Sequence, residues 1–215
     1  MGSNAQGKPF RIGLKVSPSI DWASSGSTAT KNLGIRPGLG LGVFGDYYVV
    51  ENVGLSTGLN FNMMNMRYQF VDFRRIENFL EETQVPVERR FKAVNLEIPV
   101  KLKVKMDVVD FWKVFVEAGV GMSFNLKDKG KDKYDAYGIS FEDTKYVDYS
   151  YVYRMFQTSI IFGMGAEYEL NRNLSLFPQA TFNHALSNMF VKQLEKQTGS
   201  ILNSNFIGIE IGVLF

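Results

Sequence analysis

Residues 94–106 read Val-Asn-Leu-Glu-Ile-Pro-Val-Lys-Leu-Lys-Val-Lys-Met, so apolar and polar side chains alternate without a break. Alternation with a period of two is typical of a β-strand with two unlike faces. Strands in soluble sheets usually have about five or six residues. A strand of this length, tilted by about 45°, covers roughly 30 Å, slightly more than the apolar band of an outer-membrane barrel. The stretch therefore predicts one strand of a membrane β-barrel.

Length and composition agree with a single barrel domain. The chain has 215 residues, a formal net charge of +2 and no block of Lys and Arg like a nucleic-acid-binding arm, so nucleic acid is not an expected partner. It has no cysteine, which excludes a disulfide scaffold, a thiolate metal site and a lipid anchor on an N-terminal Cys. The sequence has no run of about 18 apolar residues, so we expect no transmembrane helix.

The first residues look like the start of an exported protein. Met1-Gly2-Ser3 resembles a leader added for expression, and Asn4-Ala5-Gln6 resembles the remnant of a signal-peptidase site. We therefore expect a cleaved signal peptide, a processed N-terminal segment at residues 1–9, and an outer-membrane β-barrel domain at residues 10–215.

The same alternation recurs along the chain. Strands are expected at residues 10–22, 35–48, 53–68, 94–106, 114–126, 153–170, 174–186 and 204–215. The connections alternate between long and short, which is typical of outer-membrane barrels. We predict an all-β fold, an eight-stranded antiparallel up-and-down transmembrane β-barrel with short periplasmic turns, long extracellular loops and both termini on the periplasmic side. A soluble eight-stranded barrel with its faces exchanged is the alternative.

The glycines decide between these two barrels, because most of them lie on the polar face of the expected strands. They are Gly13, Gly38, Gly40, Gly42, Gly54, Gly58, Gly119, Gly121, Gly163, Gly165, Gly208 and Gly212. Glycine weakens a strand and has no advantage on a face exposed to water. Small residues are needed where eight strands converge on a narrow interior. We therefore predict that the polar face lines the lumen and the aliphatic face meets lipid.

Aromatic residues are expected in two girdles where the barrel crosses the membrane interfaces. Those at the short-turn end are Tyr47, Tyr48, Phe111, Trp112 and Tyr168, and those at the other end are Trp22, Tyr68, Phe91, Tyr151, Tyr153 and Phe182. Ordinary hairpin aromatics are the alternative interpretation.

Two long connections are expected on the extracellular side. In residues 72–84, Phe73, Ile76, Phe79 and Leu80 have helical spacing behind Asp72, which predicts a short surface helix. Its apolar stripe would pack over the barrel mouth or dock on a partner. Residues 127–151 are charged and rich in tyrosine, which suits protein recognition but also a solvated loop.

Several stretches resemble the PorT-like outer-membrane β-barrel family of the Bacteroidetes. They are residues 95–103 (NLEIPVKLK), 115–121 (FVEAGVG), 163–168 (GMGAEY), 185–188 (ALSN) and 208–215 (GIEIGVLF). The resemblance covers nearly the whole chain and implies an eight-stranded barrel. It also implies a connection with the type IX secretion system, which exports gliding and virulence proteins and requires the family's name-giving member. The C-terminal Phe215 resembles the signal read by the outer-membrane assembly machinery.

Charged side chains of both signs are expected in the lumen. The cations are Arg11, Lys15, Arg36, Lys101, Lys103 and Lys105, and the anions are Glu97, Glu117, Glu167, Glu169 and Glu210. An unpartnered buried charge costs several kcal/mol, so these groups must pair. A salt-bridged plug that keeps the barrel rigid is the first interpretation. A proton or ion path is the second, although an eight-stranded barrel leaves little room for a pore.

Catalytic constellations are weak. His184, the only histidine, lies on the lipid-facing side of its expected strand, whereas Ser187 lies on the lumenal side, so a His–Ser pair as in lipid A deacylases is not favoured. Asp132, Asp143 and Asp148 lie in an expected loop with no His nearby in sequence, which gives little support to a His–Asp protease site. We find no metal-ligand spacing, phosphate loop or nucleophile elbow, and predict no catalytic, cofactor-binding or metal residues and no small-molecule substrate.

These observations and the resemblance lead to one functional hypothesis. The protein is expected to be a non-catalytic subunit or assembly factor of a protein secretion system of type IX. Its expected partners are outer-membrane lipid, lipopolysaccharide and other secretion-system proteins, which it would contact through its loops or periplasmic rim. A stand-alone structural or adhesive barrel is the alternative, and an envelope enzyme such as a lipid A-modifying barrel is a further one.

Overall fold

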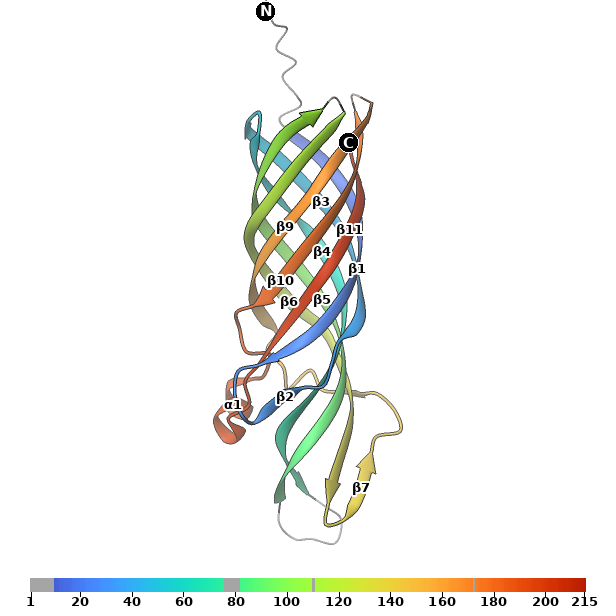
Figure 1. Ribbon diagram of the computed structural model, residues 1–215. Coiled ribbons are helices and arrows are strands. Elements are labelled where there is room, and N and C mark those ends of the chain that lie inside the picture. The colour runs from blue at the N-terminus through green and yellow to red at the C-terminus, as the bar shows by residue number, and fades with distance from the viewer. Residues whose placement is uncertain (1–9, 76–81, 110, 172) are drawn as a thin grey trace, which may run out of the picture.

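The computed structural model describes residues 10–75, 82–109, 111–171 and 173–215, most of which lie in long strands of one closed barrel. Its eight strands are β1 (Phe10–Ser25), β3 (Arg36–Val50), β4 (Val53–Arg75), β5 (Glu82–Val109), β6 (Trp112–Ala136), β9 (Phe156–Asn171), β10 (Leu174–Ala185) and β11 (Leu202–Leu214). Each pairs antiparallel with its neighbours in this order, and β1 pairs with β11 to close the cylinder (Figure 1). The predicted eight-stranded barrel is confirmed.

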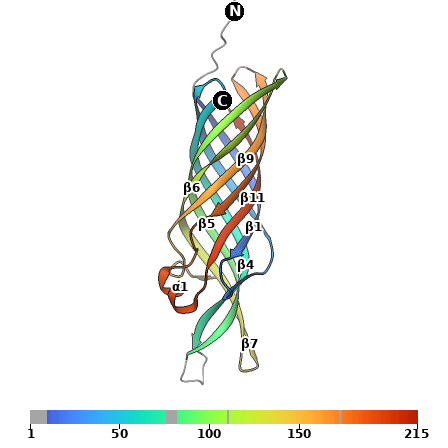
Figure 2. The same cartoon turned by 60° about the vertical axis from the view of Figure 1, so that its left-hand side comes forward.

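Four short elements complete the described chain at one end of the barrel. Strand β2 (Thr30–Asn32) pairs with β4, and strands β7 (Ile139–Glu142) and β8 (Val147–Asp148) pair with β6. Helix α1 (Lys192–Thr198) lies between β10 and β11 and ends at Gly199, whose φ of 68° is left-handed. The ends of β1 and β11 that carry the chain termini lie at the opposite end of the molecule (Figures 1 and 2).

The barrel wall has the predicted orientation, with glycine and polar residues inside and aliphatic residues outside. Along β5, for example, Lys101 and Lys103 are buried, whereas Val100 and Leu102 are about half exposed. The lumen is too narrow for a larger residue at several glycines. A Cβ added to Gly119 would lie 2.1 Å from the carbonyl oxygen of Val100. The close approach of neighbouring strands therefore requires glycine there.

Three strands extend well beyond the barrel and continue its sheet as a projecting part, which we call the extension. It comprises residues 64–75 of β4, residues 82–93 of β5, residues 127–136 of β6, and β7 (Figure 1). The predicted surface helix at residues 72–84 is wrong, because the described residues on both sides of its centre pair as strands, from Asp72 with Val85 to Arg75 with Glu82. The helical spacing of a few apolar residues is overridden by pairing with the neighbouring strand. Ile76, Phe79 and Leu80 lie outside the described residues.

The connection at residues 127–151 is also more ordered than the sequence indicates. Strand β6 continues to Ala136, and β7 and β8 return alongside it. A bulge explains the continuation, because Val94 pairs with Lys127 while Asn95 pairs with Asn125, leaving Leu126 as an extra residue. A bulge shifts the side-chain alternation by one position, so the lysines that follow face outward although their parity in sequence is that of lumenal residues.

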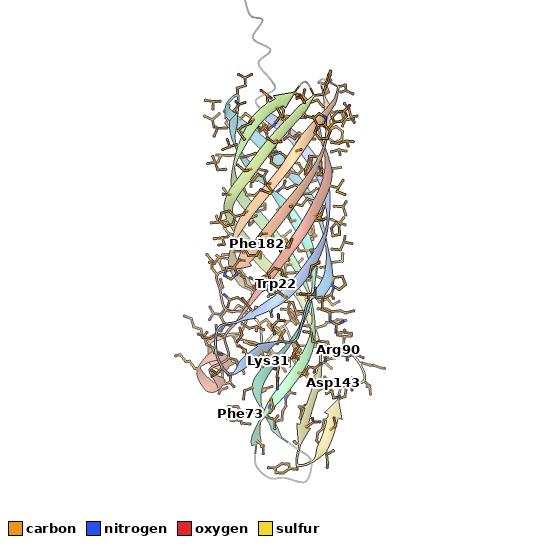
Figure 3. The ribbon with its side chains drawn as sticks, in the orientation of Figure 1. Trp22, Lys31, Phe73, Arg90, Asp143 and Phe182 are labelled. Carbon is orange, nitrogen blue, oxygen red and sulfur yellow. The ribbon has the colours of Figure 1, made fainter. Side chains whose placement is uncertain are left out.

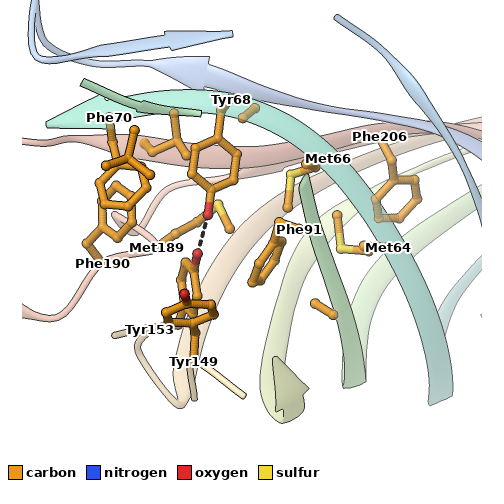
Figure 4. Close-up of a cluster of buried hydrophobic side chains, with 14 of the residues drawn as sticks. Met64, Met66, Tyr68, Phe70, Phe91, Tyr149, Tyr153, Met189, Phe190 and Phe206 are labelled. Carbon is orange, nitrogen blue, oxygen red and sulfur yellow. Dashed lines mark hydrogen bonds between the residues drawn. The ribbon is translucent and has the colours of Figure 1, made fainter. Parts of the chain in front are cut away.

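The polarity of the wall inverts where the extension begins. In β5, inward residues change from Asn95 and Glu97 in the barrel to Phe91 and Val87 in the extension. Outward residues change in the opposite sense, from valine and leucine to Lys92 and Arg90. A core of methionine and aromatic side chains fills the base of the extension and the mouth of the barrel; its labelled members are Met64, Met66, Tyr68, Phe70, Phe91, Tyr149, Tyr153, Met189, Phe190 and Phe206 (Figure 4).

The two predicted girdles of aromatic residues are only partly present, because several of these residues lie inside the molecule. Trp22 and Phe182 stack on the outer face of the barrel with ring centroids 6.3 Å apart (Figure 3), and Trp112 and Tyr168 lie 4.9 Å apart at the other end. Tyr47 and Phe111 at that end are exposed as well. Four other residues do not face lipid: Tyr68, Phe91 and Tyr153 are buried in the core of the extension, and Tyr48 donates a hydrogen bond to Asp46. Tyr151 is exposed in a loop.

Candidate functional site

The lumen of the barrel contains a network of ion pairs centred on Glu167. This carboxylate is fully buried and contacts three cations: Oε2 lies 3.2 Å from Nη1 of Arg11 and 2.9 Å from Nζ of Lys105, and Oε1 lies 2.8 Å from Nζ of Lys103. Lys103 also donates to Asp46 at 2.7 Å. The four strands β1, β3, β5 and β9 are thereby joined across the interior, which is a strong constraint on barrel shape.

Two further pairs lie deeper along the lumen. Nζ of Lys15 donates to Glu210 at 2.8 Å, and Lys101 donates to Glu117, which also accepts a bond of 3.1 Å from Gln179. The predicted pairing of lumenal charges is therefore confirmed for eight of the eleven residues, namely Arg11, Lys15, Lys101, Lys103, Lys105, Glu117, Glu167 and Glu210. Because every member has a partner of opposite sign, the network holds the barrel together rather than presenting a free charge.

The other three expected charges have different surroundings. Glu97 is buried but accepts hydrogen bonds from the amides of Asn60 (2.9 Å) and Asn183 (2.8 Å) instead of meeting a cation. Glu169 lies at the rim, half-buried, with Nζ of Lys113 2.7 Å away. Arg36 is half-buried at the start of β3, and within the described residues no carboxylate forms an ion pair with it.

Two lumenal carboxylates were missed by sequence reasoning. Asp46 is buried and bonds to Lys103 and Tyr48, and its place on the polar face of residues 35–48 could have revealed it. Asp21 is buried near the mouth, where it accepts bonds from Ser19 (2.7 Å) and from the backbone N–H of Asn65 (2.9 Å).

Little space is left in this interior. Two cavities in the described part of the lumen each have a volume of about 10 Å³, which is enough for about one water molecule. Both are lined by Glu97 and Asn183. Met64 and Phe206 of the aromatic core line the second cavity (both labelled in Figure 4). The arrangement is that of a filled barrel, as the salt-bridged plug predicts.

In the described part of the extension, Asp132 forms ion pairs with two arginines, the buried Arg89 and the partly exposed Arg74. Arg89 is 1 % exposed, and its Nε and Nη2 atoms donate to the two carboxylate oxygens of Asp132 at 2.5 and 2.6 Å. The guanidinium also lies 3.7 Å from the ring centroid of Tyr149. Burial by itself raises the pKa of Asp132, but the hydrogen bonds and charge of Arg89 hold it below its usual value. This bidentate, stacked arginine fixes β5 against β6 and the following loop.

Asp128, near the junction of barrel and extension, has no such partner. It is buried, its Oδ1 atom accepts no hydrogen bond within the described structure, and the nearby carboxylate is that of Asp148. Burial, together with the charge of Asp148, raises the pKa of Asp128 to about 7. The junction therefore holds a carboxyl group that titrates near neutral pH.

Among the described residues considered for catalysis, no hydrogen bond joins His184 to Ser187 or to an aspartate, although Asp132 and Asp143 lie side by side. His184 bonds through Nδ1 to Asn205 and stacks on Phe182, whereas Ser187 bonds to Thr158 at 3.0 Å. Among the aspartates of the expected loop, Asp132 binds Arg89, and Asp143 accepts a bond from the backbone N–H of Asp132 at 3.0 Å. The described residues contain no group of three or more His, Cys, Asp or Glu side chains placed to hold a metal ion. None of the described helices is long and apolar enough to span a membrane.

Comparison with known proteins identifies the family. The model of the outer membrane protein beta-barrel domain matches residues 4–191. The chain belongs to the outer-membrane β-barrel family. As a member of that family it lies in the bacterial outer membrane, with its aliphatic face toward lipid.

Three solved outer-membrane barrels match most of the chain at low sequence identity, with TM-scores below 0.5. Neisserial surface protein A is 12% identical, with 96% of each chain covered and a TM-score of 0.49. Ail, the attachment invasion locus protein of Yersinia pestis, is 13% identical, with 96% of this chain and 97% of that chain covered and a TM-score of 0.41. The outer membrane protein OprG from Pseudomonas aeruginosa is 12% identical, with 96% of this chain and 95% of that chain covered and a TM-score of 0.40. No curated protein matches the chain by sequence.

Proposed function

We propose that this outer-membrane barrel is a non-catalytic scaffold whose extension binds a protein partner outside the cell. The observation that carries the proposal is the contrast between a filled lumen and an ordered sheet that projects from it. The eight strands close without the extension, so the additional residues of β4, β5 and β6 are not needed to span the membrane. The buried Arg89–Asp132 pair keeps this projecting sheet in one shape, and a rigid surface loses little entropy on binding.

The extension offers strand edges for such a partner. In the described part of the chain, β7 pairs with β6 alone, and residues 71–75 of β4 pair only with β5. An exposed edge can accept an extended segment of another chain as a further strand. Phe73 and Ile139 lie at these edges with 41% and 57% of their surfaces exposed, so they can add apolar contacts to the backbone hydrogen bonds.

The resemblance to PorT-like proteins favours a partner within a secretion machine of type IX. In this form of the proposal the barrel is a subunit or assembly factor, and contacts through the periplasmic rim supplement those of the extension. The second candidate is a stand-alone structural or adhesive barrel, which the extension would serve equally well. Enzyme activity has less support, because His184 and Ser187 bond to different partners.

Gentle detergent extraction from native membranes, followed by affinity capture of the full chain and mass spectrometry, tests the proposal. We expect a stable protein partner, reduced capture of it by the double variant Phe73→Lys and Ile139→Lys, and no effect of the control Tyr151→Lys, an exposed loop residue that belongs to neither edge strand. Equal capture by the double variant would refute the strand-edge contact.

Deletion of the gene separates the two candidates. A subunit or assembly factor predicts that type IX cargo is no longer secreted, whereas a stand-alone barrel predicts secretion at the wild-type level and recovery of no stable partner. An altered lipid A profile in a His184→Ala variant would instead support the envelope enzyme.

A further inference from the structure

The outer face of the extension is strongly basic where it meets the membrane. Just beyond the aliphatic band, outward side chains on three adjacent strands form what we call the basic surface: Arg67 of β4, Arg90 and Lys92 of β5, and Lys127, Lys129 and Lys131 of β6. Arg90, Lys92 and Lys127 are exposed and the other three are partly exposed. Figure 3 labels Arg90, which lies on the extension just below the barrel in that view.

Strand register places these cations directly opposite one another. Arg67 pairs with Arg90, Arg90 pairs with Lys131, and Lys92 pairs with Lys129. Like charges at directly opposed positions of neighbouring strands destabilise a sheet. A surface that concentrates them therefore gains stability when anions lie against it.

The protein itself supplies few of those anions. Glu88 binds Arg67 with 2.6 Å between Oε1 and Nε. Within the described residues no carboxylate forms an ion pair with any of the other five cations. Lys92 and Lys131 instead lie 4.6 and 5.3 Å from the ring centroid of Tyr146. Asp148 of β8 is in register with Lys129 but forms no ion pair with it. Further from the membrane, Lys133 pairs in register with Glu88 and Glu142.

The position of the basic surface indicates what kind of anion it meets. On β5 the outward residue after Lys92 is Val94, and on β6 Lys127 follows Leu126, which is 55% exposed. A molecule lying here would have its acyl chains on the aliphatic band and its headgroup on the cations. On β10, β11 and β1, by contrast, the residues at this level are His184, Asn205 and Trp22, which are in register with one another and include no lysine or arginine.

We propose that the basic surface binds the phosphate groups of a phosphorylated lipid of the outer leaflet, of the lipid A type, with its acyl chains against Val94 and the neighbouring aliphatic side chains. Arginine and lysine provide the charge-assisted hydrogen bonds that phosphate oxygens accept. The bound lipid neutralises opposed cations such as Lys92 and Lys129. It also anchors the extension to the membrane surface, on the side of the barrel formed by β4, β5 and β6.

Native mass spectrometry of the full chain in dodecyl maltoside tests this site, with diphosphoryl lipid A as the probe. We expect the triple variant Lys92→Gln, Lys129→Gln and Lys131→Gln to bind the probe more weakly by a factor on the order of a hundred. Each basic residue near a charged lipid surface contributes about 1 kcal/mol, or about a fivefold change in affinity. Raising the salt concentration should weaken wild-type binding in the same direction.

The control variant carries Lys31→Gln, Lys192→Gln and Lys196→Gln, which remove the same charge from exposed positions outside the basic surface. It should bind the probe like the wild type. Equal binding by the two triple variants would overturn the proposal, as would equal binding of fully dephosphorylated lipid A. Complete displacement of the probe by millimolar inorganic pyrophosphate would show an acyl-independent phosphate site and refute the lipid as its occupant. Because this readout involves no protein partner, its failure is distinguishable from failure of the strand-edge contact.

Discussion

The barrel and the extension share three strands, yet their interiors are built from opposite kinds of residue. Inside the barrel, carboxylates and ammonium groups pair around Glu167. Inside the extension, methionine and aromatic side chains pack together, with Arg89 and Asp132 as a buried ion pair among them. The exterior inverts at the same point, from aliphatic in the barrel to basic in the extension.

This difference shows that the surroundings of the wall decide the composition of its interior. Where lipid surrounds the strands, outward positions must be apolar, and the alternation of a strand leaves the inward positions for polar residues. Where water surrounds the strands, the hydrophobic effect becomes available and the inward face forms an ordinary apolar core. The change from Asn95 to Ala93 inside β5, and from Val94 to Lys92 outside, marks the membrane boundary on one strand.

The largest loss of stability is expected from a substitution that breaks the lumenal network of ion pairs. Glu167→Gln leaves Arg11, Lys103 and Lys105 with too few anions in a buried site. Removing one partner of a buried pair costs about 3–5 kcal/mol, so we expect a loss of this order in the free energy of unfolding. Urea unfolding in detergent micelles, followed by heat-modifiable gel migration, measures it. The control Glu169→Gln breaks only the half-exposed rim pair with Lys113 and should cost about 1 kcal/mol or less.

Breaking the ion pair of the extension should have a local effect instead. Arg89→Met leaves the buried Asp132 with only the partly exposed Arg74 as an ion-pair partner. The cost should be about 3 kcal/mol, the lower end for a broken buried pair, and confined to the extension. We expect hydrogen exchange of β5 and β6 amides in the extension to accelerate while the urea midpoint of the barrel stays unchanged. A parallel loss of barrel stability would show that the two regions unfold as one unit.

The membrane boundary can be sharpened by placing the same charge on either side of it. Val100→Lys introduces an outward charge within the aliphatic band and should cost about 2–4 kcal/mol. Gln84→Lys introduces the same charge on the exposed outward face of β5 in the extension and should leave stability within about 0.5 kcal/mol. Unfolding in lipid vesicles measures both. Equal costs would contradict a lipid boundary between these positions.

The stability of the extension should also depend on pH. Because the pKa of Asp128 is raised to about 7 in the folded chain and lies near 4 when unfolded, the folded extension binds this proton more tightly. Its stability is therefore greatest below about pH 4 and falls as the pH rises toward about 7. Hydrogen exchange of β6 amides, corrected for intrinsic rates, should show less protection at pH 8 than at pH 5. Asp128→Asn should remove this dependence, and Asp135→Asn, at an exposed position of β6, should retain it.

Sequence reasoning succeeded where alternation acts within one strand. The register of residues 94–106, the inward glycines and most of the lumenal charges follow from the period of two and the cost of charge in lipid. The prediction that the strand begins at Val94 failed. On its N-terminal side the inward residues, such as Phe91 and Ala93, are apolar and the outward residues are polar, so the lipid-facing apolar stripe does not continue there. The bulge at Leu126 hid the same continuation in β6. The assignment of Tyr68, Phe91 and Tyr153 to a girdle failed for the same reason.

The sequence by itself determined the membrane barrel, the count of its strands and which face meets lipid, since each of these depends on side-chain chemistry repeated along single strands. Only the tertiary structure decided the partners of Glu167, the core of the extension and the basic surface. The reason is distance along the chain: Arg11 and Glu167 are 156 residues apart in sequence, and Arg67, Arg90 and Lys131 come from three strands. Contacts of this kind exist only after closure and register have placed those strands side by side.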